Sequence, residues 1–288
     1  MRPSRSEFLD VRGLRYRITR WGPPSDDPIV LLHGFLDVGL TFQFLVDALP
    51  EDWSFVAPDW RGFGASQGTD SSYWFPDYLA DLEVLLEHFV PDRPARVVGH
   101  SMGGNVAMLH AGVRPERVRW LASLEGFGLP RTRADQAPER FAQWLDALRE
   151  PQRRSRYPSL ERFAATLRIR NPRLGAERAR FIAEAWTRAD GEALELAADP
   201  WHRLVNPVLY RRDEAEACWR RIRAPVLMLL GELSEYLPRL GDDGRDDYFR
   251  ALIPRLTLQT LAGVGHMMHH EDPAAVAAAI RTFEQEQA

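Results

Sequence analysis

Short apolar runs alternate with amphipathic segments along most of the 288-residue chain. The runs expected to form strands are PIVLLHG, SFVAPDW, ARVV, VRWLASLEGFG, PVLMLLGE and LTLQTLAG. Continuous apolar runs of this kind are typical of strands buried on both faces of a parallel sheet. Between them, segments such as YLADLEVLLEHF space their apolar residues by three and four positions, which predicts helices with one buried face. The alternation predicts an α/β fold with a mostly parallel sheet and flanking helices.

Both ends of the chain extend this pattern. The N-terminal segment FLDVRGLRYRITRW predicts a β-hairpin that turns at Arg12 and Gly13. Further helices are expected around residues 42–49, near residues 248–252 and from Pro273 onward.

Residues 130–223 interrupt the alternation. Helical spacing continues there, for example at Phe141 and Trp144, but no stretch has a convincing strand pattern. We therefore expect an all-helical cap, or lid, inserted into a core made of residues 1–129 and 224–288. The cap holds 20 Arg and 14 acidic residues, a net charge of +6, whereas the remainder carries −10. Either a basic lid attracts an anionic substrate, or the lid docks on an acidic core.

The composition is that of an ordinary globular protein, with 45% hydrophobic and 27% charged residues. A net charge of −4 does not suggest a nucleic-acid or membrane-surface partner. The chain has no Lys, which excludes lysine Schiff-base and phosphate-loop chemistry. Its single Cys218 cannot form an internal disulfide. The first 22 residues show no secretion signal, and the run from Val226 to Leu230 is too short to span a bilayer, so a cytoplasmic protein without membrane insertion is expected.

The segment GHSMGG, residues 99–104, has the spacing Gly-x-Ser-x-Gly. It directly follows a predicted buried strand and begins a predicted helix. Ser101 at such a sharp turn would project its hydroxyl, and the glycines around it leave room for the strained backbone. The pattern is common by chance, but its place between a strand and a helix predicts that Ser101 is a nucleophile.

His266 follows the strand LTLQTLAG and a Gly-x-Gly turn. A neutral imidazole there can accept the Ser101 proton and return it to the leaving group. The alternatives are a loop histidine without chemistry, or a metal site formed by His266, His269 and His270. We expect no metal, because the sequence shows no second cluster of ligands. We also expect no cofactor, because no dinucleotide or phosphate-loop motif is present.

The segment HGF, residues 33–35, follows the first long buried strand. The backbone N–H groups of Phe35 and Met102 are expected to hold a negatively charged oxygen of the substrate. His33 is expected to support this loop rather than to act as a catalyst.

Five motifs, HGF, DWRGFGAS, GHSMGG, GELSE and GHMMHHEDP, occur in an order that resembles the α/β-hydrolase superfamily, and more narrowly its lidded serine-esterase and serine-hydrolase-like branch. The resemblance covers nearly the whole chain, although the cap matches only in type. It implies Ser101 as nucleophile, His266 as general base and acid, and Phe35 and Met102 as oxyanion donors through their backbones. Related dehalogenases and epoxide hydrolases place Asp where this chain has Ser101, which argues against those two reactions.

The third member of the implied catalytic triad is not obvious. In many members of the superfamily an acid stands three positions after the Gly that ends the strand PVLMLLG, and here that position is Ser234. We predict Glu235, because GELSE resembles a variant family pattern, Gly-x-x-Ser-Asp, and the longer Glu can offset a small backbone shift. The alternative is Glu125, at the end of the preceding strand. Glu232 and the acids at 242 and 243 are weaker candidates.

The expected activity is that of a carboxylesterase-like serine hydrolase, which cleaves an ester, lactone or thioester through an acyl-enzyme. The aromatic side chains of the cap suggest a small-molecule substrate with an apolar acyl or alcohol part. A C–C bond hydrolase or an aminopeptidase with the same triad is an alternative. A ligand-binding protein with this fold and little turnover is another. The oligomeric state cannot be read from the sequence.

Overall fold

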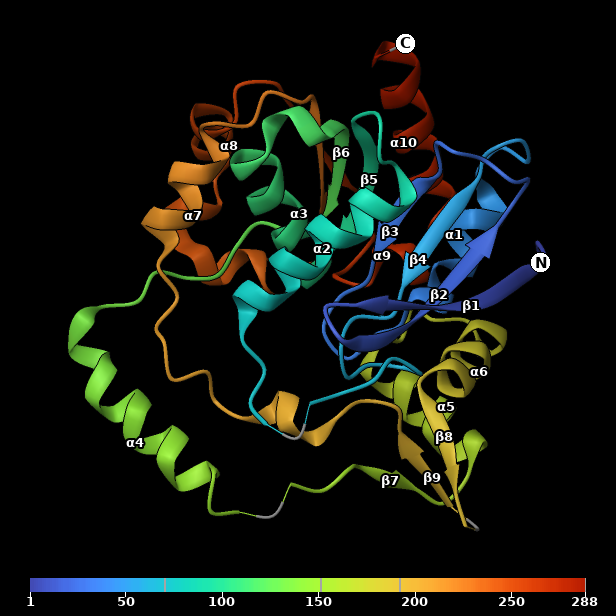
Figure 1. Ribbon diagram of the computed structural model, residues 1–288, viewed down its shortest axis with the longest axis vertical. Coiled ribbons are helices and arrows are strands. Elements are labelled where there is room, and N and C mark those ends of the chain that lie inside the picture. The colour runs from blue at the N-terminus through green and yellow to red at the C-terminus, as the bar shows by residue number, and fades with distance from the viewer. Residues whose placement is uncertain (70, 151, 192, 288) are drawn as a thin grey trace.

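An eight-stranded sheet runs through the middle of the computed structural model, which describes residues 1–69, 71–150, 152–191 and 193–287 (Figure 1). The strands, in the order in which they lie side by side, are β1 (Ser4–Val11), β2 (Leu14–Trp21), β4 (Phe55–Pro58), β3 (Ile29–Leu32), β5 (Ala95–His100), β6 (Val118–Leu124), β10 (Val226–Gly231) and β11 (Leu256–Leu261). The pairs β1–β2 and β2–β4 are antiparallel, and all later neighbours are parallel. Every apolar run predicted as a strand forms one, so the predicted fold class is confirmed.

The N-terminal hairpin is also confirmed. Its strands β1 and β2 pair from Ser4 with Trp21 to Val11 with Leu14. Arg12 and Gly13 form the turn, with φ angles of 51° and 80°. Glycine adopts such positive angles without penalty, which explains why the chain reverses here.

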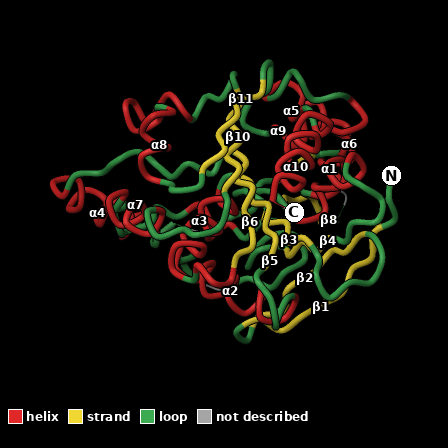
Figure 2. Tube along the Cα trace, turned by 90° about the horizontal axis from the view of Figure 1, so that it is seen from above, coloured by secondary structure: helices red, strands yellow, loops and turns green. Residues whose placement is uncertain are grey.

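Helices cover both faces of the sheet, as Figure 2 shows from above. One face carries α2 (Phe75–Phe89), α3 (Met102–Val113), α7 (Arg212–Trp219) and α8 (Asp246–Leu252), and the other carries α1 (Gln43–Ala48), α9 (Met268–Glu271) and α10 (Pro273–Gln287). Strand residues alternate between the two apolar layers: Val30 of β3 packs on the first, and Leu31 on the second. Within the described ranges, no helix has both the length and the apolar character needed to cross a bilayer.

The segment between residues 130 and 223 is not all-helical, so this part of the prediction is wrong. It contains α4 (Ala137–Ala147), α5 (Leu160–Arg170) and α6 (Ala176–Ala185), and also a three-stranded antiparallel sheet of β7 (Arg156–Tyr157), β9 (Ala193–Leu196) and β8 (Thr187–Asp190). These strands are short and mostly half-buried or exposed. They therefore lack the continuous apolar run by which the core strands are recognised.

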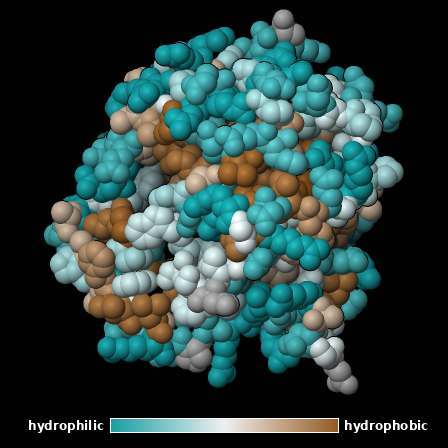
Figure 3. Space-filling view, viewed as in Figure 1, coloured by the Kyte–Doolittle hydropathy of each residue, from teal (hydrophilic) through white to brown (hydrophobic). Residues whose placement is uncertain are grey.

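The two ends of this segment behave differently. Its last helix, α7, packs against α3, and Trp219 of α7 is buried in the main core. Its first helix, α4, stands away from the body and buries none of its residues (Figure 1). Apolar side chains are visible along that edge of the surface in Figure 3, where Phe141 and Leu145 of α4 are exposed.

The turn between β5 and α3 depends on an unusually close approach of backbones. A Cβ atom added to Gly103 would lie 2.6 Å from the carbonyl carbon of Leu32 and 2.8 Å from the carbonyl oxygen of His33. A Cβ on Gly99 would lie 2.7 Å from the backbone of Gly103. Side chains at these positions would push α3 away from strands β3 and β5.

We expect Gly103→Ala to lower the free energy of unfolding by about 2–3 kcal/mol, because the added methyl group meets rigid backbone rather than a movable side chain. Gly175→Ala is the matched control, since a Cβ there has no neighbour within 4 Å. The control should lower the unfolding free energy by less than about 1 kcal/mol, the usual effect at a helix N-cap. Urea denaturation of the three proteins measures both values, and equal effects of the two substitutions would contradict the packing described.

Candidate active site

Ser101 stands at the sharp turn between β5 and α3, with φ 50° and ψ −113°. Positive φ is strained for a residue with a side chain, so the surroundings must hold it. The Ser101 N–H donates to the carbonyl of Leu124 on β6 at 2.8 Å, and the Ser101 carbonyl accepts from the N–H of Asn105 at 2.9 Å. The strained backbone is thereby fixed from both sides, and the hydroxyl stays partly accessible.

The imidazole of His266 lies next to this hydroxyl. Nε2 of His266 is 3.1 Å from Oγ of Ser101, and 17% of the His266 side chain is exposed. His266 comes from the loop between β11 and α9, and its backbone carbonyl accepts a hydrogen bond from Nε2 of His100 at 2.9 Å. The ring of Tyr236 lies over the imidazole, with centroids 4.4 Å apart.

Glu125 lies on the other side of the His266 ring. Its Oε2 is 3.0 Å from Nδ1 of His266, and its side chain is fully buried. Oε1 accepts from the N–H of Gly231 at 2.7 Å, and Oε2 also accepts from the hydroxyl of Ser234. With Nδ1 donating to this carboxylate, the Nε2 lone pair of a neutral His266 faces Ser101.

The structure does not bring Glu235, the acid that we predicted, to His266. Glu235 is exposed, and its backbone carbonyl accepts a hydrogen bond from Arg239. Its neighbour Ser234 is buried and contacts Glu125, whereas the Glu235 side chain is exposed. The place beside Nδ1 of His266 is filled by the alternative acid, Glu125.

The loop that follows β3 passes directly beside the nucleophile. A Cβ on Gly34 would lie 3.2 Å from Cβ of Ser101. Within the described chain, the backbone N–H groups of Phe35 and Met102 donate no hydrogen bond. His33 is buried in the same loop, where its Nε2 accepts from the N–H of Trp60 at 2.8 Å.

Burial lowers the pKa of His33, which keeps its imidazole neutral. With Nε2 occupied as an acceptor, Nδ1 donates to the carbonyl of Gly34 at 2.7 Å. His33 therefore fixes the shape of this loop.

The 130–223 segment holds the loop of His266 from outside. Glu271, at the end of α9, accepts from the N–H of Gly265 at 2.7 Å and from Nδ2 of Asn171 at 2.9 Å, and it pairs with Arg173. Arg178 donates to the Glu271 carbonyl at 2.8 Å. At least two arginines of the basic segment thus dock on the core, in agreement with the second interpretation of the charge separation.

The arrangement can carry out nucleophilic chemistry. A hydroxyl within hydrogen-bond reach of a neutral imidazole can lose its proton as it attacks, and a buried carboxylate behind the ring stabilises the imidazolium that forms. Sequence reasoning missed the contribution of Ser234, which donates to the carboxylate, and that of His100, which holds the loop. The only sequence signal for them is that Ser234 lies in GELSE and His100 in GHSMGG.

Comparisons with known proteins agree with this fold. A family model described as the alpha/beta hydrolase fold matches residues 27–273. A serine hydrolase-like protein of Danio rerio is 30% identical over 300 residues, covering 100% of this chain and 90% of its own. Esterase YbfF of Escherichia coli (strain K12) is 28% identical and covers 90% of this chain and 93% of its own. The solved thioesterase domain from the curacin biosynthetic pathway superposes with a TM-score of 0.85 at 25% identity, over 97% of this chain and 99% of that domain.

The family match extends over most of the chain, and the sheet order, the turn at Ser101 and the neighbouring His266 agree with it. The chain therefore belongs to the α/β-hydrolase family, and its relatives identify it as a hydrolase.

Proposed function

We propose that the protein is a serine hydrolase that cleaves a carboxylic ester or thioester through an acyl-enzyme intermediate. The observation that carries the proposal is the hydrogen-bonded series from Ser101 through His266 to Glu125, with distances of 3.1 Å and 3.0 Å. A nucleophile, a base and a group that orients the base are the three parts that such chemistry needs.

In the acylation step, Oγ of Ser101 attacks the carbonyl carbon while its proton passes to Nε2 of His266. The backbone N–H groups of Phe35 and Met102 stabilise the negative charge that develops on the carbonyl oxygen. His266 then gives the proton to the departing alcohol or thiol, which leaves an acyl group on Ser101. A water molecule attacks this acyl group, loses a proton to His266, and releases the carboxylic acid and the free Ser101 hydroxyl.

The rim of the site and the relatives support an ester or thioester with an apolar part as the substrate. Phe35, Leu233 and Tyr236 are large apolar or aromatic residues that stay exposed near Ser101 and His266. They favour a small molecule with an apolar acyl or alcohol part. The relatives include one named as an esterase and one as a thioesterase domain, so both bonds belong to the proposal. We further propose that residues 130–223 form the cap of this site, with residues 1–129 and 224–288 as the core.

The first test concerns the acid. We expect Glu125→Gln to slow the labelling of Ser101 by a fluorophosphonate, and the turnover of a p-nitrophenyl ester, by about 10³–10⁴-fold. Losing the charge with its geometry kept costs about 10⁴ in the serine-protease template. The side-chain oxygen of Gln can still accept a hydrogen bond from the N–H of Gly231. Its NH₂ group then points toward Nδ1 of His266 and donates to it. This favours the tautomer that is protonated at Nε2, which cannot accept the Ser101 proton. Mass spectrometry follows the labelling.

Glu235→Gln is the matched control, because the same substitution there changes an exposed side chain away from His266. It should keep the labelling rate within about twofold of wild type, as expected for a surface change. If Glu235→Gln slows labelling and Glu125→Gln does not, the assignment of the acid is overturned. Failure of the folded wild type to label at all would overturn the serine-hydrolase proposal itself.

A second test moves the acid to the neighbouring strand. Ser234 contacts the same oxygen of Glu125 that contacts His266, so an Asp at 234 should place its carboxylate near Nδ1 of His266. We expect the double variant Glu125→Ser with Ser234→Asp to react at least about tenfold faster than Glu125→Ser alone, because a buried charge beside the imidazole is restored. Ser234→Asp alone should be slower than wild type, because two carboxylates then share one buried site.

The matched control for this exchange is Glu125→Ser with Ser234→Asn, which has the same shape without the charge. Stopped-flow labelling of the folded variants compares the rates. Equal rates for the Asp and Asn double variants would show that position 234 does not reach the imidazole.

A further inference from the structure

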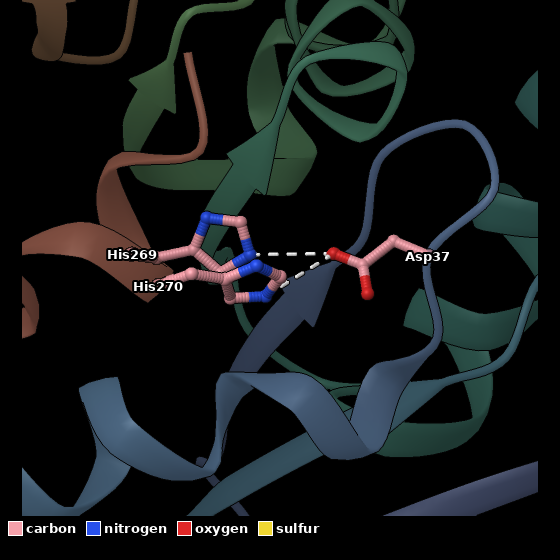
Figure 4. Close-up of side chains that lie close together, drawn as sticks. All are labelled: Asp37, His269 and His270. Carbon is pink, nitrogen blue, oxygen red and sulfur yellow. Dashed lines mark hydrogen bonds and ion pairs between the residues drawn. The ribbon is translucent and has the colours of Figure 1, made fainter. Parts of the chain in front are cut away.

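A second cluster of ionisable side chains lies behind the active site and takes no part in the proposed chemistry. Asp37 comes from the loop that follows β3, and His269 and His270 come from α9 (Figure 4). One ligating atom of each of the three lies within 4.8 Å of the others, and all three residues are at most 2% exposed. The cluster therefore joins the loop of Phe35 to the segment that follows His266.

The carboxylate of Asp37 is held in a fixed orientation. Its Oδ1 accepts hydrogen bonds from the N–H of Val38 at 2.8 Å, from Oγ1 of Thr41 at 2.6 Å and from Nε1 of Trp186 at 2.7 Å. These three donors occupy one oxygen and leave Oδ2 facing the two histidines. Such outer hydrogen bonds are what aligns a carboxylate ligand in metal sites.

The carboxylate of Asp37 faces histidines rather than arginines. Within the described ranges, the ion pairs of Asp37 are with His269 and His270 only. Nε2 of His270 faces Asp37 but has no hydrogen-bond partner in the described structure. A buried anion is normally paired or bound to a metal, and an unpaired buried nitrogen is rare.

The two nitrogen–oxygen separations in the cluster suit a metal ion. Nε2 of His269 is 3.3 Å from Oδ2 of Asp37, and Nε2 of His270 is 3.6 Å from the same oxygen. The second separation is too long for a hydrogen bond. Ligands around a tetrahedral zinc ion, with bonds of 2.0–2.1 Å, lie about 3.3–3.4 Å apart. Two imidazoles and one carboxylate are also a ligand set that divalent transition metals favour.

We propose that Asp37, His269 and His270 form a buried site for a divalent transition metal, with Zn²⁺ as the best match. Three protein ligands leave the fourth position of a tetrahedral ion to a water molecule. The bound ion ties the loop of Phe35 to α9 and so stabilises the two segments that flank Ser101. The proposal departs from the expectation, drawn from the sequence, that no metal is bound. Asp37 lies 232 positions before His269 and no ligand-spacing motif links them, so the sequence did not indicate Asp37 as a partner of His269 and His270. The proposal does not depend on the proposed hydrolase activity.

The test is the metal content of the intact protein produced in zinc-supplemented medium, so that the buried site can fill during folding. After gel filtration, elemental mass spectrometry should find about one Zn²⁺ per chain. Asp37→Asn and His270→Gln should each lower the content at least about tenfold, because loss of a ligand weakens binding at least as much as loss of an outer hydrogen-bond partner, which costs about 10–100-fold in affinity. The control is His110→Gln, since His110 is also buried and pairs with an acid, Glu83, on another face. It should keep the zinc content of wild type.

A wild type with far less than one zinc ion per chain would overturn the proposal, and would leave a His269–Asp37 ion pair as the role of the cluster. Zinc retained by folded Asp37→Asn and His270→Gln variants would overturn it as well. If the variants do not fold, the visible bands of Co²⁺-substituted wild type decide: tetrahedral nitrogen and oxygen ligation supports the site, and octahedral aqueous-like spectra overturn it. Metal content is read independently of Ser101 labelling, so failure of one proposal is distinguishable from failure of the other.

Discussion

The burial of the Glu125 carboxylate determines how the segments around Ser101 and His266 are arranged. Glu125 is removed from water, and its two oxygens are satisfied by the N–H of Gly231, the hydroxyl of Ser234 and Nδ1 of His266. A buried charge left without these donors would be strongly unfavourable. The end of β6, the end of β10 and the loop after β11 must therefore keep their relative positions. The orientation of His266 toward Ser101 follows from that requirement.

The loop of His266 is held from several directions besides this one. His100 of β5 binds its backbone from beneath, and the cluster at Asp37 contacts the short helix that follows. From the 130–223 segment, Arg178 donates to the end of that helix, and Trp186 donates to Asp37. The segment that separates the two halves of the chain in sequence is thus part of the support of the site. Movement of that segment is coupled, through these contacts, to the geometry around Ser101.

The sequence was sufficient for the sheet and the hairpin, and it singled out Ser101 and His266, which lie 3.1 Å apart, because each is marked by a strong local signal. Buried parallel strands are continuous apolar runs, and the turn at Ser101 needs small residues at fixed spacing. The strands β8 and β9 have no such run, since most of their residues are exposed or only half-buried in a small sheet. They could not be distinguished from helical or irregular chain by periodicity alone.

The prediction of Glu235 as the acid beside His266 failed for a different physical reason. Parallel strands β6 and β10 end side by side, so a carboxylate after either strand can reach the same imidazole. Choosing between Glu125 and Glu235 required the direction of each side chain, which depends on the φ of 56° at Glu125 and on the inward turn of Ser234. The contact between Asp37 and α9 was hidden in a similar way, because its partners meet only after the whole sheet has formed.

Because the carboxylate beside His266 comes from Glu125 at the end of β6, the stretch that follows β10 does not supply it. Residues 235–244 approach the active site through Tyr236, whose ring packs on the imidazole, but Nδ1 of His266 bonds to Glu125 rather than to an acid of this stretch. Under the proposed mechanism, mutations beyond Leu237 can reshape the entrance and leave the hydrogen bonds of Ser234, Glu125 and His266 in place. In evolutionary terms, substitutions in this stretch can change which substrates enter the site and leave the reacting groups unchanged. Directed evolution of new specificities would begin with it.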